Sequence, residues 1–230
     1  MTQLANPALF SFPPQAQVGR VLPKSKIYEH GRISTALRER FVKQVEQITW
    51  QYKLAPETIN LPARAGVAEI EIFDIALKTE TLVDDVLRAI DRAIPLPILF
   101  QLHYQARTRM VATYKRPSVA DAGKWVLDSD FAGYHATEWQ PADAARQPLP
   151  IALDLHSLYE QLLRSLLPQP ARPGERLPDQ LERLTRLRSR QNEYNQLEAR
   201  LHKEKQFNRK VALNAELREL KTEIDQLATD

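Results

Sequence analysis

Asp74 and Lys78 are the residues whose types and spacing most suggest chemistry, because they lie four positions apart in one apolar segment. Glu46, on the preceding segment, supplies a second acid. Metal-dependent nucleases hold a divalent cation with carboxylates and place a lysine near the attacking water. These residues therefore define one hypothesis, a divalent-metal nuclease or phosphodiesterase. In the nuclease pattern an acid stands two residues before the lysine, but here that residue is Ala76. The alternative is therefore that Asp74 has a purely structural role.

The sequence contains no other catalytic or cofactor signature. Its five histidines stand singly, and no two of them have the i, i+4 spacing of a helical metal site. It has no cysteine, which excludes disulfides, thiolate ligands and cysteine nucleophiles. Its six glycines form no phosphate-binding loop. We therefore expect no metal and no cofactor, and we favour a non-enzymatic protein over an enzyme.

The overall charge is too small to indicate a partner. The chain has 32 basic and 29 acidic residues, a net charge of +3, so only a local basic patch could bind nucleic acid. No stretch approaches the roughly 18 apolar residues of a membrane span. The N-terminal residues lack the basic start and apolar run of a signal peptide. We expect a cytoplasmic protein with no membrane association.

Two segments are locally basic, one near residue 24 and one near residue 115. If they meet in space, they form a cationic surface with an aromatic ring for stacking, which suits a nucleic-acid backbone or a protein partner. The alternative is that they are the solvated ends of a strand and a loop. The candidate binding residues are Lys24, Lys26, Arg32, Arg109, Tyr114, Lys115 and Arg116.

The C-terminal part has the pattern of a coiled coil. After a proline-rich linker at 168–178, apolar residues recur at heptad spacing in two registers, before and after the segment 203–212. Either the chain turns there into an antiparallel hairpin or the seam shifts within one helix. No Gly or Pro marks a turn, but we favour the hairpin because an isolated helix gains little from its apolar seam. The expected interface residues are Leu184, Leu187, Tyr194, Leu201, Leu213, Leu217, Leu220, Ile224 and Leu227.

The segment 1–167 predicts an α+β or α/β domain. We expect an irregular arm over 1–23 because of its prolines, and an amphipathic helix over 34–54 capped by Ser34. Further helices are expected between 79 and 94 and over 153–167, and strands over 67–78, 97–104, 110–114, 125–127 and 134–139. This order gives a mixed sheet of about four to five strands covered by helices. A helical or coiled-coil extension follows over 179–230.

Several longer motifs carry a resemblance to a known family. They are LPKSKIYEH, VEQITWQYKLAPETINL, IDRAIPLPILF, YKRPS and KEKQFNRKVALNAELREL. Together they make the chain resemble, over nearly its whole length, a bacterial domain-of-unknown-function family numbered 4391. Genes of that family often neighbour helicase and DNA-methyltransferase genes in restriction-like or phage-defence loci, so the resemblance implies a role near DNA. It supplies no catalytic residues.

These observations lead to two main hypotheses. The first is a non-enzymatic interaction or adaptor module of a bacterial DNA-processing or phage-defence-like complex. Its partner would be a protein, such as a helicase or DNA methyltransferase, or a second copy bound through the C-terminal helices, with nucleic acid as a further partner. The alternative is the nuclease that uses Asp74 and Lys78. A small-ligand pocket between sheet and helix is a third hypothesis, with no support beyond the fold.

Overall fold

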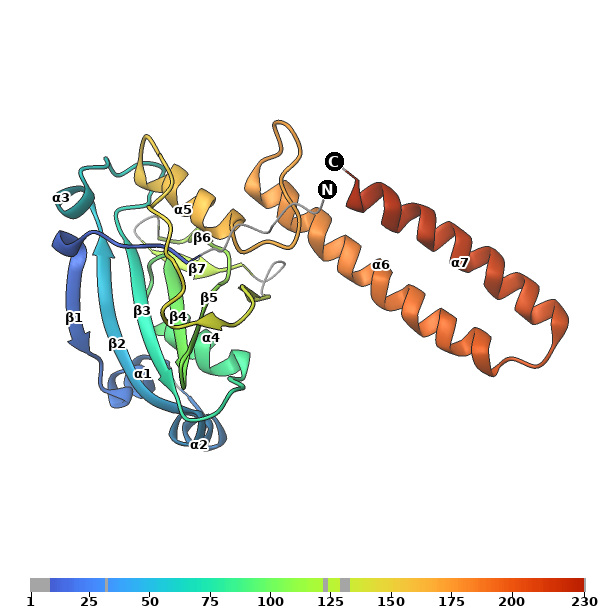
Figure 1. The fold of residues 1–230 in the computed structure, drawn as a ribbon, viewed down its shortest axis with the longest axis horizontal. Coiled ribbons are helices and arrows are strands. Elements are labelled where there is room, and N and C mark those ends of the chain that lie inside the picture. Colours follow the sequence, from blue (N-terminus) through green and yellow to red (C-terminus); the bar gives the residue numbers. More distant parts are fainter. Residues whose placement is uncertain (1–8, 32, 122–123, 129–132, 230) are drawn as a thin grey trace. The chain divides into compact units, whose positions relative to one another are not determined.

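The computed structural model describes residues 9–31, 33–121, 124–128 and 133–229. The chain divides into two compact units, 1–167 and 168–230. The first holds a mixed sheet with helices, and the second is a helical hairpin (Figure 1). The α+β class is therefore confirmed. No helix within the described ranges is long and apolar enough to cross a membrane.

The first unit is built on a sheet to which its described residues contribute seven strands. Strands β1 to β5 lie side by side in sequence order, and β8 and β9 both pair with β5 (Figure 1). All these pairs are antiparallel except β3 and β4, which are parallel and joined by α4. The strands are β1 Gln17–Val21, β2 Val45–Leu54, β3 Ile70–Leu77, β4 Ile98–Tyr104, β5 Arg107–Ala112, β8 His135–Ala136 and β9 Gln140–Pro141. A separate sheet pairs β6 Lys115–Pro117 with β7 Trp125–Leu127.

Three helices pack on one face of this sheet. Ile27 of α1, Phe41 of α2 and Ile90 of α4 share a buried core with Phe73 and Ile75 of β3. Because side chains alternate along a strand, the residues between them on β3 point to the opposite face. The helices of this unit are η1 Pro14–Ala16, α1 Lys24–Gly31, α2 Thr35–Gln44, α3 Pro56–Ile59, α4 Asp84–Ala93 and α5 Leu155–Arg164.

The helix expected over 34–54 is only half correct. It begins as predicted, because the Ser34 Oγ accepts a hydrogen bond from the Leu37 backbone N at 3.3 Å. It ends at Gln44, however, and the chain continues directly into β2. The first half of the predicted helix is therefore α2, and the second half is the long inner strand β2.

A bulge in β2 explains the error. The register of β2 against β3 shifts between Val45 and Gln47, so Val45 and Ile48 lie in the same core. A β-bulge inserts one extra residue into a strand, which turns the usual two-residue period into a spacing of three. That spacing is normally typical of a helix.

The prediction of an irregular arm over 1–23 is also wrong in part. Residues 17–21 form β1, which pairs antiparallel with β2 at the edge of the sheet. Since its partner segment was expected to be helical, this short segment had no strand to pair with in the predicted fold. Strands β1, β2 and β9 are additions to the predicted sheet, and the predicted strand 125–127 lies in the separate sheet with β6. The main sheet therefore has seven strands among the described residues instead of four to five. Residues 1–8 lie outside the described part of the chain.

The second unit confirms the hairpin. Helices α6 Leu177–Lys203 and α7 Phe207–Ala228 run side by side in opposite directions (Figure 1). The turn needs neither Gly nor Pro because a side chain supplies its hydrogen bonds. The Glu204 Oε1 accepts from the backbone N atoms of Lys205 and Gln206 at 2.7 and 2.8 Å.

The open end of the hairpin is tied by residues of the preceding linker. Arg183 of α6 donates from Nε to the Glu175 Oε1 at 2.7 Å and from Nη1 to the Leu227 carbonyl at 3.1 Å. Arg172 donates from Nη2 to the Gln226 carbonyl at 2.6 Å. Residues 168–176 thus pack within the second unit and hold the ends of α6 and α7 together.

Candidate functional site

Asp74 belongs to a hydrogen-bonded network on the sheet face opposite α1, α2 and α4. Its Oδ1 accepts from the Gln101 Nε2 at 2.7 Å, and its Oδ2 lies 3.5 Å from the His103 Nε2. The Gln101 Oε1 accepts in turn from the Arg146 Nη1 at 2.6 Å. The carboxylate is therefore held by neighbours on β4, which agrees with a structural role.

The other two residues of the nuclease hypothesis have different neighbours. The Lys78 Nζ donates to the Val42 carbonyl of α2 at 2.9 Å. Glu46 lies on β2, not on a helix, and interacts electrostatically with Lys24. Within the described ranges, no group of three or more His, Asp or Glu side chains could hold a metal ion. The structure thus adds no geometric support to a metal-dependent nuclease.

The first basic segment forms α1 and is engaged locally. The Lys24 Nζ donates to the Val45 carbonyl at 2.6 Å, and burial followed by repulsion from Lys78 lowers the pKa of Lys24. The Lys26 Nζ lies 3.2 Å from the Glu29 Oε2 in an exposed ion pair. Arg32 lies outside the described residues.

The second basic segment is largely structural. Lys115 is fully buried, and its Nζ donates to the carbonyls of Asp91, Ile94 and Leu96 at 2.8, 2.7 and 2.7 Å. The Arg116 Nε donates to the Asp128 Oδ2 at 2.8 Å. Burial raises the pKa of the neighbouring residue, Tyr114. A ligand on the surface cannot reach Lys115, so we leave it out of any proposed interface.

Arg109 stands in a surface of mixed charge. Its guanidinium lies 4.6 Å from the centre of the Trp139 ring, and Arg107 lies 5.6 Å from the same ring. The Arg107 Nη2 also lies 3.0 Å from the Glu80 Oε1. Burial lowers the pKa of Arg109, while Asp84 among nearby acids opposes that shift. Both guanidinium groups lie over the Trp139 ring, Arg107 is paired with an acid, and further acids lie near Arg109, which gives a poor surface for nucleic-acid backbone.

Several of the predicted coiled-coil residues lie in the seam between α6 and α7. Leu217 and Leu220 of α7 are buried against Leu197 of α6, with Tyr194, Leu201 and Leu213 packed around them. Leu184 is buried, and Leu187, Ile224 and Leu227 are half-buried. Leu197 also belongs to the seam, although it was not among the interface residues predicted from the sequence.

The tip of the hairpin carries an apolar pair that the sequence patterns did not single out. Phe207 is 77% exposed and Val211 is 54% exposed. They lie one helical turn apart on α7, so they share a face. We define the hairpin tip as these two residues with their exposed cationic neighbours, Lys203, Lys205, Arg209 and Lys210. The clue in the sequence was a phenylalanine in a basic turn, outside both heptad registers.

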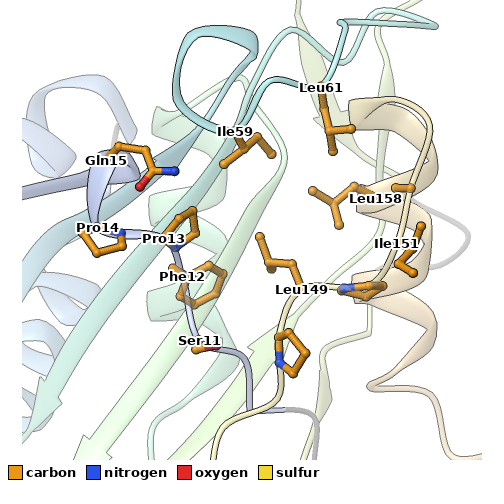
Figure 2. Close-up of a pocket in the computed structure, with 13 residues that line it drawn as sticks. Ser11, Phe12, Pro13, Pro14, Gln15, Ile59, Leu61, Leu149, Ile151 and Leu158 are labelled. Carbon is orange, nitrogen blue, oxygen red and sulfur yellow. The ribbon is translucent and has the colours of Figure 1, made fainter.

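The first unit also has an apolar groove of about 670 Å³. Its walls are two proline-rich segments, 11–15 and 148–152. Figure 2 shows Ile59, Leu61 and Leu158 pointing toward the space between these segments. Ile151, on its rim, is 95% exposed. Nothing about its lining indicates which apolar group would fill it.

Comparison with known proteins gives one match. The sequence model of the family described as Domain of unknown function (DUF4391) matches residues 10–224. The chain belongs to the DUF4391 family. The match spans both units, so the hairpin is part of the DUF4391 domain and not an appendage to it. No curated protein and no solved structure matches this DUF4391 chain.

Proposed function

We propose that this protein is a non-enzymatic adaptor that binds a protein partner through the hairpin tip. The observation that carries the proposal is the exposure of Phe207 and Val211 beyond the end of the buried seam. A hairpin that already buries its own seam gains nothing from an exposed phenylalanine. Exposed apolar side chains that lie together typically mark an interaction surface.

The chemistry of the tip describes the partner. An aromatic residue is a frequent anchor of a protein interface, where it fills an apolar pocket. The cations around it favour an acidic rim on the partner and speed association. A protein surface fits this pair better than nucleic acid, because Val211 offers no flat ring for a base to stack on.

The biological setting rests on the family resemblance. We propose that the partner is a DNA-processing enzyme, such as a helicase or DNA methyltransferase, in a bacterial phage-defence-like complex in the cytoplasm. A second copy of this chain and nucleic acid are the competing partners. Each of them gives a different result in the test below.

The test is capture followed by direct binding. Tagged full-length protein is used to capture partners from a host lysate with and without nuclease treatment, and each captured enzyme is purified and titrated against it. The double variant Phe207→Ser/Val211→Ser should bind at least about tenfold more weakly, and salt should weaken binding further. Val42→Ser is the matched control, since Val42 of α2 is 57% exposed but lies in the other unit.

Three results would overturn the proposal. The first is a partner that binds the tip variant as tightly as the wild type. The second is recovery of nucleic acid alone, lost on nuclease treatment. The third is a stable homodimer by light scattering that the tip variant does not disrupt and that binds no other protein.

A further inference from the structure

A cavity of about 470 Å³ opens between the main sheet and the helices α1 and α4. Trp50 of β2, together with Glu71 and Phe73 of β3, lines it from the sheet, and Ile27 of α1 and Ile94 after α4 line it from the helices. Its volume is in the range of small-molecule sites, and such sites combine apolar walls with a few polar groups. It lies within the first unit, so an occupant here is independent of the proposed adaptor role.

Glu71 is the polar group that distinguishes this cavity. Its side chain is only 3% exposed, and its Oε2 accepts a hydrogen bond from the Trp50 Nε1. Glu69 lies beside it and lines the same cavity. The Lys53 Nζ binds the Glu69 Oε2 at 2.8 Å and is shared with the Glu57 Oε1 at 2.9 Å. Three carboxyl groups therefore depend on one lysine.

The protonation of Glu71 reflects this shortage of positive charge. Burial, reinforced by the neighbouring Glu69, raises the pKa of Glu71 to about 8, against which the hydrogen bond from Trp50 acts. At neutral pH the Glu71 carboxyl group is therefore protonated. A cation bound beside it would favour the ionised form and release this proton. Strongly raised carboxyl pKa values inside clefts are typical of functional sites.

We propose that this cavity binds an organic ammonium ion, with its apolar body against Phe73 and Ile94 and its ammonium group against the carboxyl groups of Glu69 and Glu71. Both carboxyl groups, when ionised, offer only hydrogen-bond acceptors, which suits the donors of an ammonium group. The aromatic rings of Trp50 and Phe73 attract a cation in addition.

The charges that surround the cavity are of both signs. The basic groups facing it or its carboxyl pair are Arg20 of β1, Lys26 and His30 of α1 and Lys53 of β2. The acids on the same elements and their neighbours are Glu29, Glu57, Glu69 and Glu71. Lys26 is paired with Glu29, and Lys53 with Glu57 and Glu69. Within the described part of the chain, Glu71 forms no ion pair, so an ammonium group would supply one.

The test is calorimetric titration of the full-length protein with three probes of equal length. These are hexylammonium, hexanol and hexanoate, and only the ammonium ion should bind. Because its binding expels the Glu71 proton, its affinity should rise by up to roughly tenfold per pH unit from about pH 6 and level off above about pH 8. Titrations in two buffers of different ionisation enthalpy should show the release of that proton.

Two variants and one control make the result decisive. Glu71→Gln should weaken ammonium binding at least about tenfold and abolish its pH dependence, and Ala93→Leu should block binding by filling the cavity. Glu39→Gln should bind normally, since Glu39 of α2 is exposed and does not line the cavity. Circular dichroism confirms that each variant folds. Equal binding of hexanol or hexanoate, binding that survives in folded Glu71→Gln, or no binding of any probe would overturn the proposal.

Discussion

Lys115 illustrates, at the scale of one residue, how a lysine in a basic motif can serve the fold. Its ammonium group donates to three carbonyls at the end of α4, where unsatisfied carbonyls and the helix dipole favour a cation. It also lies 3.1 Å from the Asp91 Oδ1, an ion-pair distance without hydrogen-bond geometry. The Asp91 Oδ2 accepts a hydrogen bond from the Tyr134 hydroxyl at 2.6 Å. Burial lowers the pKa of Lys115 and raises that of Asp91, and each charge opposes the shift of the other.

Replacing Lys115 should therefore destabilise the protein strongly. Lys115→Met should lower the free energy of unfolding by about 3–5 kcal/mol, because it leaves Asp91 buried without its cation. Adding Asp91→Asn should restore part of this loss, since the buried charge is then removed. Urea unfolding of the two variants and the wild type measures both effects. A loss for Lys115→Met of less than about 1 kcal/mol would contradict this account.

Glu71 makes a second residue-scale prediction, about stability and pH. Its folded-state pKa of about 8 lies above the ordinary 4.5, so the stability that its protonation contributes is complete below about pH 4.5 and is lost as the pH rises through about 8. The side-chain amide in Glu71→Gln cannot ionise, so this variant does not lose stability as the pH rises. Between pH 5 and pH 9, the free energy of unfolding of the variant relative to the wild type should therefore increase by on the order of 3–5 kcal/mol. Melting temperatures of the two proteins measured across this range check the change. A difference that is constant across this range would show that Glu71 is ionised in the folded protein.

At the scale of elements, the sequence predicted best where the local pattern and the tertiary environment agree. The strand at 125–127 and the inner strands near β3 and β4 follow from their apolar residues, and the Ser34 cap marks the start of α2. The second half of the expected 34–54 helix failed because a bulge in β2 imitates helical spacing. That bulge depends on pairing with β3, which no local window contains.

The candidate sites were harder to predict than the elements, for a related physical reason. Glu71 sits within an apolar strand, and only the packing of α1 and α4 above it turns this position into the floor of a cavity. Phe207 could be seen as an apolar residue in a basic turn, but its exposure depends on where the seam of α6 and α7 ends. Lys115 is the opposite case. Its basic sequence motif predicted a residue on the surface, but the side chain is buried in the fold.

The tie between Arg183 and Glu175 gives an element-scale prediction for the hairpin. The guanidinium of Arg183 lowers the pKa of Glu175 to about 2, so its stabilising contribution is present above about pH 4.5 and is lost as the pH falls through about 2. Glu175→Gln should therefore be less stable than the wild type at neutral pH, by about 2–3 kcal/mol, and equal to it near pH 2. Thermal melts followed by helical circular dichroism between pH 2 and pH 7 check this. Glu193→Gln, which removes an exposed ion pair with Arg190, should show almost no such difference.

At the scale of the whole molecule, the two units separate the two proposed activities. The ammonium cavity lies entirely in 1–167, which has its own buried core between the sheet and the helices α1, α2 and α4. The hairpin tip lies in 168–230, which is held by its own seam and by Arg183. Each unit therefore contains all the described contacts on which its proposed site depends.

A truncated chain of residues 1–171 should reveal this separation. We expect it to keep the near-ultraviolet circular dichroism of a packed core, because the core residues around β3 all precede the cut. It should bind hexylammonium with the affinity of the full chain, and it should capture no protein partner. The full-length tip variant should give the same pattern with the hairpin still present, which distinguishes loss of the tip from loss of the fold. A folded 1–171 chain that still binds the partner would move the adaptor surface to the first unit, where the proline-lined groove would become the candidate.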